Sequence, residues 1–197
     1  MLRNPDETKS RILRKSGILF NTQGYKATSI SDITQATGYT KGAIYRHFKN
    51  KSILEKETLS HLSSLMFETL RAQIKNEKTA GNKLRAIFRY FESYVTRSEV
   101  KGGCPLMNAA IEADDSNPML RKEAVKILDV LMNSVTTILK NGIRFKQIKK
   151  DTDVVYHATI IIASLEGAIM MSKLRGNNLD IKRVIRHLDG LIGNIET

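Results

Sequence analysis

Side chains suited to binding phosphate gather in one short segment of this chain, residues 41–51. Apolar residues are interspersed there with cationic and aromatic ones. The cationic and aromatic residues are Lys41, Tyr45, Arg46, His47, Lys49 and Lys51. Lysine and arginine donate charge-assisted hydrogen bonds to phosphate oxygens, and tyrosine and histidine add further donors. Gly42 adds a position without a side chain, where another backbone can approach closely. We therefore expect this segment to bind a phosphate-lined groove.

Two short helices must position the segment, and the sequence marks both of them. Ser29 and Asp32 have the Ser-x-x-Asp spacing of a capping box, which opens a helix. That helix can run only to about residue 37, because Gly38 supplies the backbone freedom of a turn. Thr40 is the natural N-cap of a second helix. Two short helices joined by a glycine-containing turn form a helix-turn-helix, which we place at about 28–48.

The charge of the chain indicates the same kind of partner. Its 197 residues include 32 Lys and Arg against 20 Asp and Glu, a formal net charge of +12 at pH 7. Residues 1–56 hold 11 basic and 4 acidic residues, so over half of the excess lies there. Such a distribution fits duplex DNA. An anionic membrane surface is the alternative, but the charge lies on a helix-turn-helix and not on one long basic amphipathic helix.

The rest of the chain is predicted to be helical. Apolar residues recur with a helical period in the segments 50–76, 84–95, 118–141 and 181–195, and turn-forming residues separate these segments. We find no convincing strand pattern in the sequence. The predicted fold is therefore all-α, with a three-helix head that contains the helix-turn-helix and a larger C-terminal bundle, about nine helices in all.

An ordered series of residues in the first quarter of the chain is more specific than the bare motif. It comprises Phe20, Gly24, Tyr25, Thr28, Ile33, Ala36, Gly38, Gly42, Ile44, Tyr45, His47, Phe48, Lys51 and Leu54. This series closely resembles the DNA-binding region of TetR/AcrR-type transcriptional regulators. The resemblance implies a DNA-binding domain at 1–50 and an effector-binding and dimerisation domain at 51–197. It also implies a homodimeric repressor that leaves a palindromic operator on double-stranded DNA when an unknown small molecule binds.

We expect the DNA contacts to come from the exposed side of the helix-turn-helix and from the residues beside it. They are Ser29, Thr40, Lys41, Gly42, Tyr45, Arg46, His47, Lys49 and Lys51. Lys41 and Tyr45 should reach furthest into the groove. Lys51, near a helix N-terminus, should bind a phosphate together with the backbone amides.

One helix of the C-terminal part, 154–174, is apolar on nearly every side and must be buried all round. A subunit interface as well as a core would bury it, and the family resemblance implies a four-helix dimer contact made by the last two helices of each subunit. We expect this interface to include Ile162, Leu165, Ile169 and Leu188. The alternative is the central helix of a monomer. Polar interruptions such as Glu166 argue against a membrane span.

A second feature of the C-terminal part is the segment 102–112. Cys104, Asn108, Ile111 and Glu112 share one side of a short predicted helix, where polar groups can line a small-molecule cavity. The segment is similar to a Gly-Cys-x-x-x-Asn-x-x-x-Glu pattern found in a subset of the family. We expect the ligand-binding residues to be Phe91, Cys104, Met107, Asn108, Ile111 and Glu112. The alternative is that Asn108 and Glu112 only cap and solvate a short helix.

Cys104, the only cysteine, opens an alternative function. A cysteine at a helix N-terminus is stabilised as thiolate, which would suit an electrophile- or redox-sensing repressor. A small, buried and inert side chain is the plainer interpretation. A single cysteine also excludes an internal disulfide framework and fits a reducing cytosol, so we expect a cytoplasmic protein.

A small helical enzyme is the remote alternative. The histidines at 47, 61, 157 and 187 are scattered, and none has metal-ligand spacing with the cysteine. The sequence shows no glycine-rich phosphate loop and no signal peptide at residues 1–7. We therefore expect no enzymatic activity, no metal, no cofactor and no membrane partner.

Overall fold

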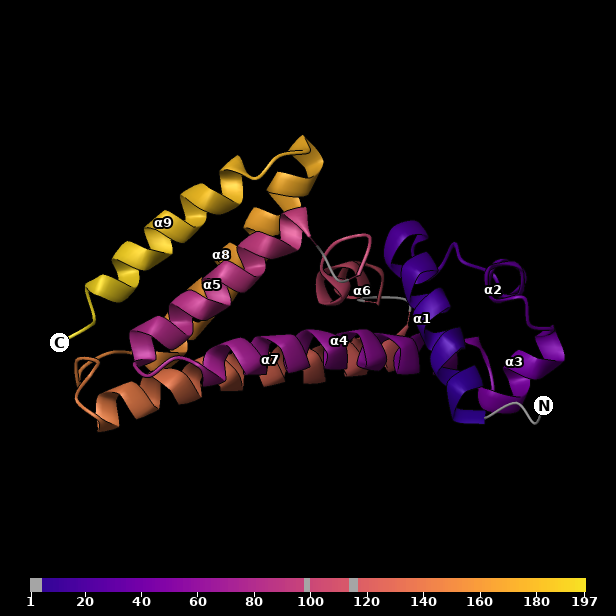
Figure 1. Cartoon of the computed structure of the whole chain (residues 1–197), viewed down its shortest axis with the longest axis horizontal. Coiled ribbons are helices and arrows are strands. Elements are labelled where there is room, and N and C mark those ends of the chain that lie inside the picture. Colours follow the sequence, from indigo (N-terminus) through magenta and orange to yellow (C-terminus); the bar gives the residue numbers. More distant parts are fainter. Residues whose placement is uncertain (1–4, 98–99, 114–116) are drawn as a thin grey trace. The chain divides into compact units, whose positions relative to one another are not determined.

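The computed structural model describes residues 5–97, 100–113 and 117–197, and the regular structure in these ranges is helical (Figure 1). The helices are α1 (Pro5–Gln23), α2 (Ile30–Thr37), α3 (Lys41–His47), α4 (Lys51–Lys75), α5 (Ala80–Thr96), α6 (Pro105–Ala113), α7 (Pro118–Arg144), α8 (Val154–Arg175) and α9 (Leu179–Gly193). Within the described ranges, β-type pairing is limited to an isolated bridge between Ile148 and Glu196. The prediction of an all-α fold with about nine helices is confirmed.

The helices group into two compact units. The first unit comprises Met1–Leu65 and Val100–Ile127, and the second comprises Met66–Glu99 and Leu128–Thr197. The first unit holds α1–α3, which we call the head, together with α6 and the beginnings of α4 and α7. The predicted boundary after residue 50 divides the chain by function and stays a prediction. By packing, α6 belongs with the head.

The local signals of the helix-turn-helix act as expected. The Ser29 hydroxyl accepts a hydrogen bond from the Asp32 amide (3.2 Å), and the Asp32 carboxylate accepts one from the Ser29 amide (2.7 Å), which completes the capping box of α2. Two hydrogen bonds from Ser29 lower the pKa of Asp32 below its usual value. The bond from the hydroxyl has the larger effect, and the bond from the backbone amide has the smaller one. Gly38 ends α2 with φ 72°, and Thr40 accepts from the Ala43 amide (3.2 Å) to cap α3.

The head is built around a small apolar core. Ile12 and Phe20 of α1 are fully buried, as are Ile33 of α2 and Ile44 of α3. Burying a side chain of this size stabilises a fold by about 1.5–3 kcal/mol. Tyr25 stacks on Phe20 with the ring centroids 4.9 Å apart, and its burial raises the pKa of its phenol well above the ordinary value. This core fixes α3 with one side turned to solvent.

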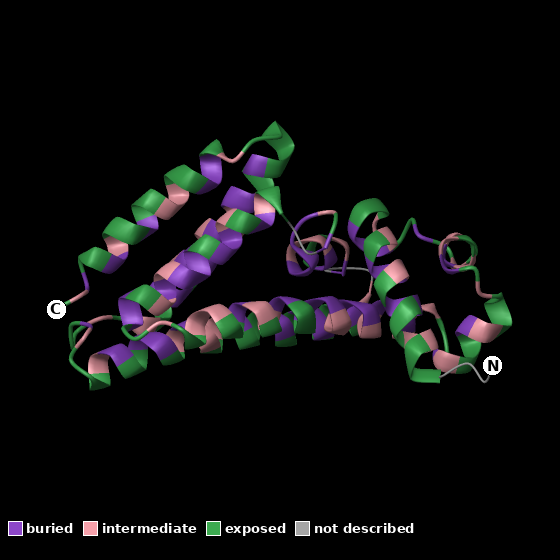
Figure 2. Cartoon of the chain, in the orientation of Figure 1, coloured by how far each residue is buried: buried purple, intermediate pink, exposed green. Residues whose placement is uncertain are grey.

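In the second unit, α5, α8 and α9 pack against one another. Buried residues run along α5, and α9 has exposed residues along much of its length (Figure 2). The predicted interface residues Ile162, Leu165, Ile169 and Leu188 all lie in this core, each no more than 7% exposed in the single chain. A side chain covered by its own subunit has no surface left for a partner. These four interface assignments are therefore corrected to core residues.

The apolar side of α8 that stays open is the opposite one. Tyr156, Met170 and Leu174 are 54%, 43% and 81% exposed. In the described parts of the chain, α8 is also the one helix long and apolar enough to cross a membrane by length and composition. That test is weak for a helix such as α8, whose other side is buried against α5 and α9.

Candidate nucleic-acid interface

Helix α3 presents the exposed side expected of a DNA-recognition helix. Ile44 is buried, whereas Lys41, Gly42, Tyr45 and Arg46 are exposed. A Cβ added at Gly42 would meet no atom of another segment within 4 Å, so the backbone at this residue is open. The Lys41 ammonium lies 6.0 Å from the centroid of the Tyr45 ring, at the outer limit of a cation–π contact. The side chains of this surface supply hydrogen-bond donors of the kind that read base edges and phosphates in a major groove.

Three further predicted contacts surround this surface. Thr40 is exposed, although its hydroxyl caps α3. His47 is half-buried beside Phe48, with the ring centroids 6.3 Å apart. Lys49 is exposed in the turn before α4. All three stay predicted DNA contacts.

Helix α1 adds cations that the sequence analysis did not single out. The Arg11 guanidinium lies 5.6 Å from the centroid of the Tyr39 ring, in the turn between α2 and α3. The Lys9 ammonium lies 5.6 Å from the Phe48 ring and pairs with Glu57 at 2.7 Å. The sequence does indicate that Arg11 is exposed, because the amphipathic pattern of α1 puts it on the side opposite the buried residues of this helix.

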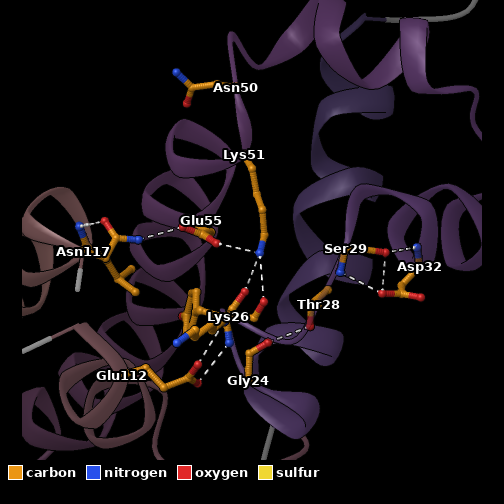
Figure 3. A network of polar contacts seen from close by, with 12 residues as sticks. Gly24, Lys26, Thr28, Ser29, Asp32, Asn50, Lys51, Glu55, Glu112 and Asn117 are labelled. Atoms are coloured by element: carbon orange, nitrogen blue, oxygen red, sulfur yellow. Dashed lines mark hydrogen bonds and ion pairs between the residues drawn. The ribbon is translucent and has the colours of Figure 1, made fainter. Parts of the chain in front are cut away.

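Two of the predicted DNA contacts already donate hydrogen bonds to other groups of the chain. Lys51 Nζ donates to the Tyr25 carbonyl oxygen at 2.7 Å and lies 3.3 Å from Glu55 Oε1 (Figure 3). Glu55 is 5% exposed, and a buried carboxylate needs such a cation. The Ser29 hydroxyl donates its proton to Asp32 at 2.7 Å. We therefore leave Lys51 and Ser29 out of the proposed set of phosphate contacts.

Glu112, predicted to bind a ligand, binds the head. Its two carboxylate oxygens accept hydrogen bonds from the backbone amides of Tyr25 and Lys26, both at 2.9 Å (Figure 3). These amides lie in the turn between α1 and α2, where Gly24 has φ 96°. A Cβ at Gly24 would come within 2.8 Å of a Glu112 oxygen, so the turn is shaped around the carboxylate.

Asn108 has a similar role one helical turn earlier. Its amide nitrogen donates to the side-chain oxygen of Asn21 (2.9 Å) and to the Asn21 carbonyl (3.1 Å). Asn21 in turn donates to the carbonyls of Lys101 and Gly103, at 2.7 and 2.9 Å. Polar bonds thus attach α6 and the loop before it to the C-terminal end of α1.

Asn117 joins α7 to the same network. Its amide nitrogen donates to Glu55 at 2.8 Å, and its side-chain oxygen accepts from the Leu120 amide at 3.1 Å (Figure 3). Lys51, Glu55 and Asn117 therefore connect the starts of α4 and α7. A cavity of about 230 Å³ lies among these groups and Glu112.

The remaining predicted ligand residues do not form one site with these. Cys104 is 1% exposed, Met107 is half-buried, and Ile111 is 73% exposed. Phe91 is buried in the second unit. The burial of Cys104 shields its thiol from dissolved electrophiles, so nothing favours the sensing alternative. Among the residues that the structure describes, no three His, Cys, Asp or Glu side chains could hold a metal ion together.

The fold and this surface define a helix-turn-helix DNA-binding regulator with a helical body. Comparison with family models agrees: residues 12–57 match the bacterial regulatory proteins of the tetR family, and residues 80–188 match the tetracyclin repressor-like C-terminal domain. The chain belongs to the TetR family of transcriptional regulators.

Solved structures and a curated relative agree over nearly the whole chain. A TetR transcriptional regulator from Chloroflexus aurantiacus is 33% identical with a TM-score of 0.93, covering 98% of this chain and 97% of its own. A TetR-family regulator from Cytophaga hutchinsonii is 32% identical with a TM-score of 0.90, covering 100% and 98%. The transcriptional repressor DhaR of Mycobacterium sp. (strain GP1) is 24% identical over 177 residues, covering 90% of this chain and 87% of the relative.

Proposed function

We propose that this regulator is a homodimeric repressor that binds a palindromic operator through α3 and leaves it when a small molecule binds the second unit. The observation that carries the proposal is the surface of α3, where Lys41, Tyr45 and Arg46 stand exposed around the bare backbone of Gly42. Two heads related by a two-fold axis would reach successive major grooves about 34–36 Å apart. Thr40, His47 and Lys49 would contact the flanking backbone.

The open side of α8 supports the homodimer. Tyr156, Ala163 and Met170 are exposed at intervals of seven residues, so they lie on one side of the helix. Gly167, on the same side, lets another backbone approach closely. An apolar stripe of this length on a regular helix is typical of an interaction surface, and the same stripe on a second copy is its simplest partner. Leu179 of α9 is a further apolar side chain of this unit that is 54% exposed.

The attachment of α6 to the head supports the release step. A displacement of α6 would move Glu112 and Asn108 away from the turn after α1, or would draw this turn along with it. Either change alters the placement of α2 and α3 on DNA. An effector then acts by its difference in affinity between the DNA-binding state and the other state.

Operator selection from a random duplex library, followed by competition binding, tests the proposal. Enrichment of an inverted repeat is expected, together with a strong loss of affinity as salt rises. Lys41→Ala should change the preference among operator variants by about 1–3 kcal/mol if Lys41 contacts a base edge. Lys49→Ala should weaken all duplexes alike and lower the salt slope by about one unit.

The matched control is Lys140→Ala, which removes an exposed lysine of α7 in the second unit. It should leave both the preference and the slope unchanged. A failure to enrich any sequence, or enrichment of a site without internal symmetry, would contradict the proposal.

The relatives support two further parts of the proposal. The curated relatives of similar length are named as transcriptional regulators, which supports a regulatory and non-enzymatic role for this chain. A regulator of bacterial operators works in the cytoplasm, and we propose that location here.

A further inference from the structure

A groove in the second unit has the size and the chemistry of a ligand site. It lies between the second half of α4 and the middle of α7, which run side by side in the same direction (Figure 1), and its volume is about 410 Å³. Small-molecule sites in proteins commonly occupy about 300–1,000 Å³. All residues that line it belong to the second unit, so its shape depends on that unit alone.

The floor and ends of the groove are apolar. Leu70 and Ile138 are 3% and 8% exposed and form the floor. Phe67, Ile74 and Val130 line it further along, and Val130 is 44% exposed although it is apolar. From residue 67 to residue 74 a helix rises about 10 Å, which sets the length of an apolar body that the groove can cover.

The polar groups of the groove can all donate hydrogen bonds, and Arg71 can only donate. Arg71 of α4 and Asn133 and Thr137 of α7 line it with exposed side chains. Arg71 is the one charged residue among those lining the groove, so no lining carboxylate neutralises it. A guanidinium presents a planar pair of N–H groups that matches a carboxylate, and the amide and hydroxyl opposite can donate to the same group.

We propose that this groove binds the effector, and that the effector is a small carboxylate with a flat or branched apolar body about 10 Å long. The apolar body covers Leu70 and Ile138, and the carboxylate pairs with Arg71. The effector role rests on the proposed function, whereas the binding of a carboxylate in the groove does not. Both walls are helices that begin in the first unit, so a ligand that changes their separation acts on elements that continue toward the head.

Calorimetry with 2-naphthoate, and with its uncharged analogue 2-naphthamide, tests the site in the full-length protein. The carboxylate should bind at least tenfold more tightly than the amide. Arg71→Gln should weaken 2-naphthoate at least tenfold and leave 2-naphthamide unchanged. The matched control Lys75→Gln removes the cation one turn further along α4, outside the groove, and should change either affinity less than twofold.

The outcomes separate this inference from the proposed function. Absence of 2-naphthoate binding, or equal binding by wild type and Arg71→Gln, overturns the site. Filling the groove by Thr137→Trp should abolish binding while the helical circular dichroism is kept, and binding that survives this change also overturns it. If Arg71→Gln changes the sedimentation coefficient, the groove is covered by a second copy and the ligand assignment is wrong.

The effector role has its own measurement. Added 2-naphthoate should release the selected operator from wild type and not from Arg71→Gln. Binding in the groove without release overturns the effector role and leaves the operator assay intact. A protein that selects no operator but binds 2-naphthoate through Arg71 contradicts only the proposed function.

Discussion

Replacing Glu112 by glutamine tests whether α6 holds the DNA-binding head in place. Each carboxylate oxygen of Glu112 accepts one backbone amide at 2.9 Å, from Tyr25 and from Lys26. A hydrogen bond to a charged partner contributes about 1.5–3 kcal/mol. Glutamine keeps one accepting oxygen, removes the charge and turns an NH₂ group toward the second amide. Since Glu112 is half-buried, we expect a loss of about 1–3 kcal/mol, and somewhat more for Glu112→Ala.

Two measurements check this value. Urea unfolding followed by circular dichroism gives the change in stability, and hydrogen exchange at the Tyr25 amide shows whether the loss is local. Exchange at Tyr25 should accelerate at least tenfold in Glu112→Gln, because its amide loses a charged acceptor. Operator affinity should fall in the same variant, since the turn between α1 and α2 loses its support.

The matched control is Glu68→Gln, which changes an exposed glutamate on α4. It should alter stability by less than about 0.5 kcal/mol. An equally small effect of Glu112→Gln, with unchanged exchange at Tyr25, would refute the idea that this carboxylate positions the head. A loss of stability with unchanged operator affinity would limit Glu112 to a structural role.

Four further predictions follow from the described contacts. Lys51→Met should destabilise the protein by about 1–3 kcal/mol in urea, because Glu55 loses its cation, while the salt slope of DNA binding stays the same. Ala163→Glu should convert dimers to monomers in sedimentation velocity, because it would bury an unpaired carboxylate in the proposed dimer contact. The helical signal should be kept, since the residue is exposed in the single chain. Gly102→Ala should lower the melting temperature by several degrees, because φ is 107° there and a Cβ would overlap a backbone carbonyl. The lowered pKa of Asp32 contributes stability above its unfolded pKa of about 4, and this contribution is lost as the pH falls through the folded value, so Asp32→Asn should destabilise at pH 7 and much less near pH 2.

The head could be predicted from the sequence because its signals are local. The capping box at Ser29, the left-handed Gly38 and the cap at Thr40 each act within three or four residues. The exposed side of α3 follows from the burial of Ile44 between outward neighbours. Sequence patterns are informative at this range, and they were sufficient to predict which side of α3 is exposed.

The body could not be predicted to the same depth, for two physical reasons. Helix α8 is apolar around most of its circumference, so its periodicity does not distinguish the side that faces α5 and α9 from the side that stays open. The partners of Asn108 and Glu112 are 86 or 87 residues away in the chain, and no local pattern indicates them. The Lys51 ammonium likewise donates to a carbonyl oxygen 26 residues away, which no local pattern indicates.

At Gly42, helix stability and the close approach of another surface favour different residues. A residue with a Cβ would fit there without contact and would form helix more readily, by roughly 0.5–1 kcal/mol for alanine. Nothing in the uncomplexed head therefore requires glycine at this position. Its benefit can arise only when another surface comes close enough to exclude a methyl group. The folding free energy of the uncomplexed chain is then the wrong quantity for judging this residue. Selection for thermal stability alone would tend to remove the glycine, and with it the close approach to DNA that we propose for this position.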